Sequence, residues 1–118
     1  MTKLKPRVRT KPKAGAKPTA KEKAHMARVA ALPCLVSGEA ATFHHVTGSS
    51  FVMGRLPRNH QLGVPLAPRY YQKVHDPKAS EPISVEGLGH RGFYAKYGID
   101  LLAEAELLRL ESVMEGIL

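Results

Sequence analysis

Hydrophobic residues recur at helical spacing near both ends of the folded region. A helix is expected over residues 19–31, because Thr19 with Glu22 has the pattern of a capping box and Pro33 pushes the chain towards extended geometry. Another amphipathic helix is expected from Asp100 onwards. The apolar positions of these helices are Met26, Val29 and Ala30 in the first and Leu101, Leu107, Leu108, Leu110, Met114 and Ile117 in the last.

Two further helices are expected in the middle of the chain. Pro68 suits the first turn of a helix, where its missing N–H needs no partner, and this helix should run to about Asp76. Ser84 is a candidate cap for the next helix, which carries Phe93 and Tyr97 four residues apart and closes at Gly98.

Short apolar segments between the helices predict strands. Residues 34–38 are expected to form a short strand that runs into a turn, and residues 41–46 a second strand. After a basic, irregular loop over residues 51–63, residues 64–66 predict a brief third strand. The pattern indicates a single small α+β domain over residues 19–118, with little sheet.

The net charge of the chain lies almost entirely at one end. The chain has 118 residues and a formal net charge of +8. Its first 28 residues carry ten basic side chains and one acidic, a net charge of +9, whereas the rest carries eight basic and nine acidic, a net charge of −1. Residues 1–18 offer almost nothing to bury, so they are expected to form a disordered basic arm.

A basic arm of this kind fits a polyanionic partner, because cations that neutralise phosphates release condensed counterions. It would supply affinity for DNA without sequence information, and a solubilising tail is the alternative. The candidate contacts with nucleic acid are Lys3, Lys5, Arg7, Arg9, Lys11, Lys13 and Lys17 in the arm and Arg55 and Arg58 in the loop.

The composition argues against secretion and against a membrane partner. The basic segment lacks the central apolar stretch of a signal peptide, and no run approaches the roughly 18 apolar residues of a membrane span. Cys34 is the only cysteine, which excludes an intrachain disulfide and any all-cysteine metal site. We therefore expect an intracellular protein.

The pair His44-His45, in a segment that predicts a strand, carries the most informative chemistry. Neighbouring side chains in a strand point to opposite faces, so one imidazole could bind a metal ion while the other meets a substrate. Two partly exposed histidines at a strand end are the simpler alternative. Downstream, His60 lies in the basic loop, and His75 follows Tyr71 at the spacing of one helical turn.

The order of strand, loop, strand and helix resembles the HNH, or ββα-metal, nuclease finger. The resemblance implies that His44 and His75 bind a divalent ion (Mg²⁺, Mn²⁺ or Zn²⁺) and that His45 is the general base. His60 would help to orient the site or contact phosphate, with no role at all as the alternative. Tyr71 stands where another histidine ligand is usual, and a neutral phenol is a poor ligand for a divalent ion.

Four short motifs follow the basic arm in a fixed order. They are Cys34-Leu35-Val36-Ser37, then His44-His45-Val46, then His60 with Val64-Pro65-Leu66-Ala67-Pro68-Arg69-Tyr70-Tyr71, and last Phe93-Tyr94-Ala95-Lys96-Tyr97-Gly98. Their order and spacing, over roughly residues 34–102, resemble the phage-encoded RecA-dependent nucleases of the recombination enhancement function (Ref) family.

That family pattern also includes a structural metal site. The positions that match Cys34, Ser37, Ala67 and Tyr70 could bind a zinc ion there through two Cys-x-x-(Cys/His) steps. Only the cysteine remains in this chain. We therefore expect the structural zinc to be lost and ordinary packing to take its place.

Three further residues have simpler expected roles. His25 lies among lysines and is expected to be solvated, and Cys34 is expected to be a small buried residue rather than a nucleophile. His90 beside Arg91 is expected on the surface, with a phosphate contact as the alternative. The leucines of the last helix most simply cover the core, and a self-association face is the alternative.

Taken with the resemblance, the sequence predicts a metal-dependent HNH endonuclease that hydrolyses DNA phosphodiester bonds. The resemblance alone implies a phage or prophage protein in the cytoplasm of a bacterial host, with a role in recombination and a recombinase filament that presents the strand. Two alternatives stay open. One is a DNA-binding HNH-like protein with weak or no catalysis, and the other is a basic-tailed phage interaction protein that acts through its C-terminal helix.

Overall fold

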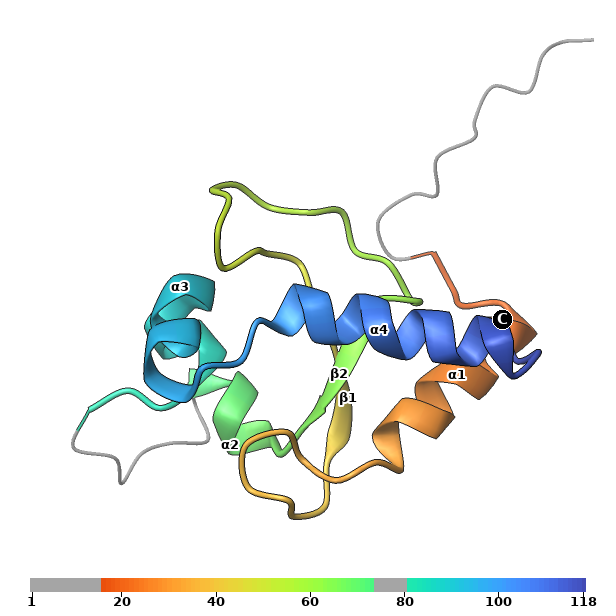
Figure 1. Ribbon diagram of the computed structural model, residues 1–118, viewed down its shortest axis with the longest axis horizontal. Coiled ribbons are helices and arrows are strands. Elements are labelled where there is room, and N and C mark those ends of the chain that lie inside the picture. The colour runs from red at the N-terminus through yellow and green to blue at the C-terminus, as the bar shows by residue number, and fades with distance from the viewer. Residues whose placement is uncertain (1–15, 74–80) are drawn as a thin grey trace, which may run out of the picture.

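The computed structural model describes residues 16–73 and 81–118 (Figure 1). Residues 1–15, which hold most of the predicted arm, and residues 74–80 lie outside the described ranges. The described part is an α+β fold with one two-stranded antiparallel sheet, which confirms the α+β class but not the HNH-like finger. Its elements are α1 (Ala20–Ala30), β1 (Thr42–His45), β2 (Gly63–Leu66), α2 (Pro68–Tyr71), α3 (Val85–Tyr97) and α4 (Leu101–Met114).

The sheet is the centre of the fold. In its register, Thr42 of β1 lies opposite Leu66 of β2, and His45 lies opposite Gly63. Strand β2 is buried along its whole length, because α1 and α4 both pack against it, and α4 runs across the sheet in Figure 1. The buried cluster beneath consists of Cys34, Val46, Val64, Leu66, Ala67, Val85, Phe93, Leu101 and Ala105.

Local signals fix three ends of two helices. Thr19 and Glu22 form both hydrogen bonds of the predicted capping box at the start of α1. The Ser84 hydroxyl accepts a hydrogen bond from the Gly87 N–H at the start of α3. Gly98 ends that helix with a φ of 72°, in the left-handed region that a residue without Cβ adopts most readily.

The predicted strand over residues 34–38 is absent. The segment forms a turn instead, in which the Gly38 N–H donates to the Cys34 carbonyl at 2.9 Å. Gly38 has a φ of 77°, which reverses the chain before a strand can extend. The other two predicted strands are confirmed as β1 and β2, within one or two residues at their ends.

The helix expected from Pro68 to about Asp76 is much shorter, because it ends at Tyr71. Gln72 is extended, with φ −99° and ψ 128°. The Lys73 N–H donates to the Glu86 carboxylate at 2.9 Å rather than to a helical carbonyl. The spacing between Tyr71 and His75 is therefore not one turn of a continuous helix, and His75 itself lies outside the described residues.

The largest correction concerns His25, which is fully buried rather than solvated. Its Nδ1 lies 2.7 Å from the Ser112 hydroxyl of α4, and its Nε2 lies 3.0 Å from the Gln61 carbonyl. The Gln61 carbonyl only accepts, so Nε2 carries the proton and Nδ1 accepts from Ser112. Arg28 also donates to Ser112, at 2.9 Å, so α1 and α4 are joined by a polar cluster inside the fold.

Helix α4 is also less buried than its leucines suggested. Leu101, Ala105, Leu108 and Ser112 face the interior. The predicted apolar positions Leu107, Leu110 and Met114 are exposed. In the described ranges, no helix combines the length and the apolar character that a membrane span requires.

Candidate functional site

The alternation of β1 separates the two neighbouring histidines, as the sequence predicts. Phe43 and His45 share one face of the strand, with their rings 5.1 Å apart edge to face. Thr42 and His44 share the other face, where the Thr42 hydroxyl lies 2.7 Å from Nε2 of His44. The two imidazoles therefore meet different surroundings, although they are adjacent in sequence.

On the Phe43 side, His45 is coupled to a second predicted site residue. Its Nε2 lies 3.0 Å from Nδ1 of His60, and Nε2 of His60 lies 2.5 Å from the carbonyl oxygen of Ala16. A carbonyl only accepts, so His60 donates from Nε2 and, with both rings neutral, accepts at Nδ1 from the N–H of His45. This series of hydrogen bonds leaves a free lone pair on Nδ1 of His45, as a general base requires.

Burial keeps the His45 ring unprotonated. Desolvation is the largest cause that lowers the pKa of His45 from 6.5 to about 4, and the positive charge of Arg58 and the rings of His60 and His44 contribute to the same shift. At neutral pH the His45 ring is therefore a neutral imidazole that can accept a proton.

The loop between the two strands brings positive charge to the same place. The Arg58 charge acts on the pKa of His45, and both Arg55 and Arg58 act on the pKa of Tyr71. Both arginines are exposed, and neither forms a salt bridge with a described carboxylate. Exposed guanidinium groups beside a neutral imidazole suit an anionic substrate such as a phosphodiester.

On the other face of β1, His44 packs against α2. The rings of His44 and Tyr71 are stacked, with 4.4 Å between their centroids and 14° between their planes. The Tyr71 hydroxyl donates to the carbonyl oxygen of His45 at 3.0 Å. Burial raises the pKa of Tyr71, so its hydroxyl stays protonated and is a poor metal ligand.

The donors for a divalent ion are incomplete in the described part of the chain. Of the two predicted ligands, His44 is described and His75 is not. Among residues 16–73 and 81–118, no group of three or more His, Cys, Asp or Glu side chains could hold a metal ion. The described residues therefore do not form a metal site by themselves.

The positions to which the resemblance assigns zinc ligands lie in a packed cluster around Cys34. Burial raises the pKa of the Cys34 thiol, but hydrogen bonds from the Ser37 side chain and from the backbone of Ala67, Ser37 and Val36 lower it more. Tyr70 packs against the buried cluster that holds Cys34 and Ala67, and its ring lies edge to face with that of Tyr97, with 6.0 Å between the ring centroids. Cys34 is buried, as predicted.

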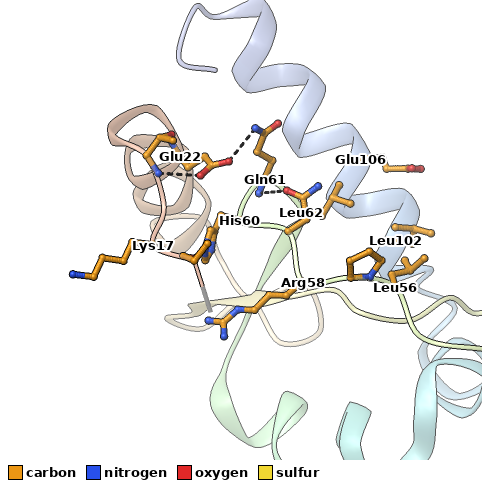
Figure 2. A pocket seen from close by; sticks show the side chains of 13 residues that line it. Lys17, Glu22, Leu56, Arg58, His60, Gln61, Leu62, Leu102 and Glu106 are labelled. Atoms are coloured by element: carbon orange, nitrogen blue, oxygen red, sulfur yellow. Dashed lines mark hydrogen bonds between the residues drawn. The ribbon is translucent and has the colours of Figure 1, made fainter. Parts of the chain in front are cut away.

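A cavity of about 670 Å³ lies beside His60 (Figure 2). It lies between the segment before α1, the end of the basic loop and α4. Lys17 and Arg58, both predicted contacts with nucleic acid, line it together with His60. Five further lining residues come from three separate segments, so no pattern in the sequence indicated that they lie together. They are Glu22, Gln61, Leu62, Leu102 and Glu106.

His90 was expected on the surface, but it is half-buried against the backbone of Gly48. A Cβ at Gly48 would come within 2.5 Å of the His90 ring. The Nδ1 atom of His90 is buried without a hydrogen-bond partner, and burial lowers the pKa of this ring. The close approach of the His90 ring leaves no room for a side chain at position 48.

Comparisons of the chain with protein-family models, with curated proteins and with solved structures gave no match.

Proposed function

We propose that this protein is an HNH-like endonuclease that hydrolyses DNA phosphodiester bonds, with His45 as the base that activates water. The observation that carries the proposal is the hydrogen bond between His45 and His60 at the end of β1. It orders a half-buried, neutral imidazole that feels the positive charge of Arg58. Near neutral pH, few other side chains can take a proton from water.

The arrangement of backbone elements supports the same proposal. Strands β1 and β2 pair antiparallel, and α2 follows β2 with Ala67 alone between them. The order strand, loop, strand, helix resembles that of the ββα finger, and His45 lies at the loop end of the first strand.

The proposed chemistry divides among few residues. Arg58, with Arg55, neutralises the phosphate and positions it. His45 removes a proton from water as the water oxygen attacks phosphorus, and the P–O bond to the leaving oxygen breaks. His60 holds the His45 ring in one tautomer and one orientation, as the positioning partner of a catalytic histidine does. A divalent ion, which the resemblance assigns to His44 and His75, would supply Lewis-acid stabilisation of developing charge.

A second candidate function is DNA binding without catalysis. The stack of Tyr71 on His44 favours it, because a protonated phenol occupies the ring position that the resemblance gives to a metal-binding histidine. In that case the arm and the loop arginines would bind DNA, and His45 would be a remnant of a site that has lost its ion.

One experiment separates the two candidates. Full-length protein and His45→Ala, purified in parallel, are incubated with supercoiled and single-stranded DNA in Mg²⁺, Mn²⁺ or Zn²⁺, and DNA binding is measured alongside. The nuclease proposal expects cutting by the wild type, none by His45→Ala, and equal binding by both. Equal cutting by both proteins removes His45 from its role.

Other outcomes assign the alternatives. Salt-sensitive binding without cutting by the wild type supports the binding protein. Absence of DNA binding under all conditions contradicts both candidates and leaves the interaction protein. The roles in phage recombination and with a recombinase filament depend on the resemblance alone, and the same assay with a recombinase–DNA filament as substrate tests them.

A further inference from the structure

The cavity beside His60 has a charged end and an apolar end. In Figure 2, Arg58 lies on one side of it, where the flexible Lys17 side chain extends outward, and Leu62 and Leu102 lie on the other. Its volume of about 670 Å³ falls within the 300–1,000 Å³ that is usual for small-ligand sites. A ligand that complements both ends combines an anionic group with a flat or apolar body.

We infer that this cavity binds one nucleotide of a DNA strand, with the phosphate between Lys17 and Arg58 and the base against the leucines. The inference rests on DNA as the partner in the proposed function, but not on cleavage. A base inside a duplex is paired and stacked, so the bound nucleotide must be unpaired or turned out of the helix.

The carboxylates of the cavity indicate which end binds the base and which binds the phosphate. Glu106 of α4 lies beside Leu102, at the apolar end, and is exposed. A carboxylate there repels a phosphate but accepts hydrogen bonds from the amino group of a base. Glu22 lies on the Lys17 side in Figure 2, where its carboxylate already accepts from the Gln61 side chain at 3.1 Å and from the Thr19 N–H at 2.9 Å, so Glu106 is the carboxylate left to meet the base.

The cavity also lies next to the proposed reaction site. His60 lines it, and the same ring accepts the hydrogen bond from His45 at 3.0 Å. Arg58 lines the cavity as well and acts on the pKa of His45. A nucleotide in the cavity would therefore place a phosphate within the reach of the site, and the neighbouring base would fix the strand in register.

An abasic scan of a short oligonucleotide tests the inference through binding alone. Each oligonucleotide lacks one base and keeps its full phosphate backbone. A base pocket predicts that removal of one particular base, at a fixed distance from one strand end or junction, weakens binding about tenfold, the usual worth of a buried base contact. A flat profile overturns the inference and leaves the nuclease proposal intact, because backbone contacts suffice for cutting.

Variants of exposed residues locate the effect. Pro57 is exposed and lines the cavity, so Pro57→Trp should fill it and remove the difference between intact and abasic strands, whereas Pro57→Ala should keep that difference. Lys17→Ala should weaken binding of intact and abasic strands several-fold more than Lys21→Ala, an exposed lysine outside the cavity. Equal effects within either pair contradict the inference.

Free deoxynucleoside monophosphates separate the two sources of the same chemistry. Titration calorimetry with the monophosphates should show weak binding that Pro57→Trp abolishes. Tight binding of a free nucleotide without any abasic effect in the oligonucleotides means that the cavity serves a free nucleotide, and it overturns the inference. Base-dependent oligonucleotide binding without cutting supports the cavity and contradicts the nuclease proposal.

Discussion

The ring of Tyr71 lies face to face with the ring of His44, and its hydroxyl donates to the backbone carbonyl of the next residue, His45. One side chain thus covers one histidine and holds the backbone of the other. The stacked ring adds contact area, and the buried hydroxyl is satisfied by a backbone acceptor, so Tyr71 ties α2 to the end of β1.

The first prediction concerns this ring. Tyr71→His should place a second imidazole beside His44 and bind Mn²⁺ or Zn²⁺ at least about tenfold more tightly, because each added nitrogen ligand replaces a water. Calorimetric titration with the metal ion measures the affinity, and DNA nicking in the same ion should rise with it. Tyr71→Phe is the matched control, since it keeps the stacked ring and lacks a ligand. Equal affinities in the two variants would show that position 71 does not face the ion.

Local signals explain what the sequence could predict. The capping box of Thr19 with Glu22, the cap at Ser84 and the end at Gly98 each depend on residues within one turn, so the helices they bound are confirmed. The opposite faces of His44 and His45 follow from the period of a strand, and the structure has them. These features need no knowledge of the rest of the chain.

Long-range contacts explain what the sequence could not predict. The partners of His25 lie 36 and 87 residues away, so its position among lysines indicated solvent although the ring is buried. Helix α2 ends early because Glu86, 13 residues further on, binds the Lys73 N–H. The link between His45 and His60 spans 15 residues of irregular loop, which no periodic pattern describes. Both histidines were predicted as candidate site residues, but the contact between them was not.

The second prediction tests His60 as a positioning residue. His60→Ala removes the acceptor that holds the His45 N–H, so His45 can turn and change tautomer, and nicking should slow by about 10–100-fold, part of what a general base contributes. His60→Asn should restore much of the rate, because its amide oxygen can accept the same hydrogen bond. Melting temperatures measured in parallel show whether the fold is kept. Equal rates for wild type and His60→Ala would remove His60 from the site.

The third prediction concerns the close approach of Phe43 to β2. A Cβ on Gly63 would overlap the Phe43 ring, so this position needs glycine for space and not for a special φ. Gly63→Ala should lower the free energy of unfolding by about 1–3 kcal/mol, as overpacking of a core does, and displace the neighbouring His45. Urea denaturation measures the change.

A compensating variant tests the cause of that change. Gly63→Ala combined with Phe43→Leu should be less destabilised than the sum of the two single variants, because the smaller side chain leaves room for the new methyl group. Additive losses would mean that the two positions do not collide.

The fourth prediction is an acid-dependent loss of stability from His25. Burial lowers the pKa of His25 below its ordinary 6.5, although the hydrogen bond to the Gln61 carbonyl opposes this. The unfolded chain therefore takes up a proton at a higher pH than the folded chain does. The stability that His25 contributes is complete above about pH 6.5 and is lost as the pH falls through the lowered folded value.

Urea denaturation at a series of pH values checks this loss, with His25→Gln as the comparison. The variant should be less stable at pH 7.5, because Ser112 and the Gln61 carbonyl lose a partner in the interior, at about 1–3 kcal/mol. Its stability should then fall less steeply than that of the wild type as the pH drops below 6.5. Parallel curves would mean that other groups, such as His45 and His90, carry the whole acid sensitivity.

The last prediction separates the arm as a source of DNA affinity from the arm as a support of the site. A deletion of residues 1–15 removes six basic side chains but keeps Ala16, whose carbonyl oxygen binds His60. If all six contact duplex phosphates, the slope of log affinity against log salt should become shallower by about 5, at 0.9 per contact. The rate of nicking at saturating protein should stay within about twofold, because the His45–His60 pair is kept.

A deletion of residues 1–18 is the matched comparison. It removes one further lysine, Lys17, together with the Ala16 acceptor, so the salt slope should change by less than about one unit more. The rate at saturating protein should instead fall about as far as in His60→Ala, because the His60 ring is no longer held. Fluorescence anisotropy across a salt series gives the slopes, and single-turnover nicking gives the rates. We expect the DNA affinity to depend on the number of basic side chains removed, and the nicking rate to depend on the Ala16 carbonyl. Equal nicking rates of the two deletions at saturating protein would show that Ala16 does not position the histidine pair.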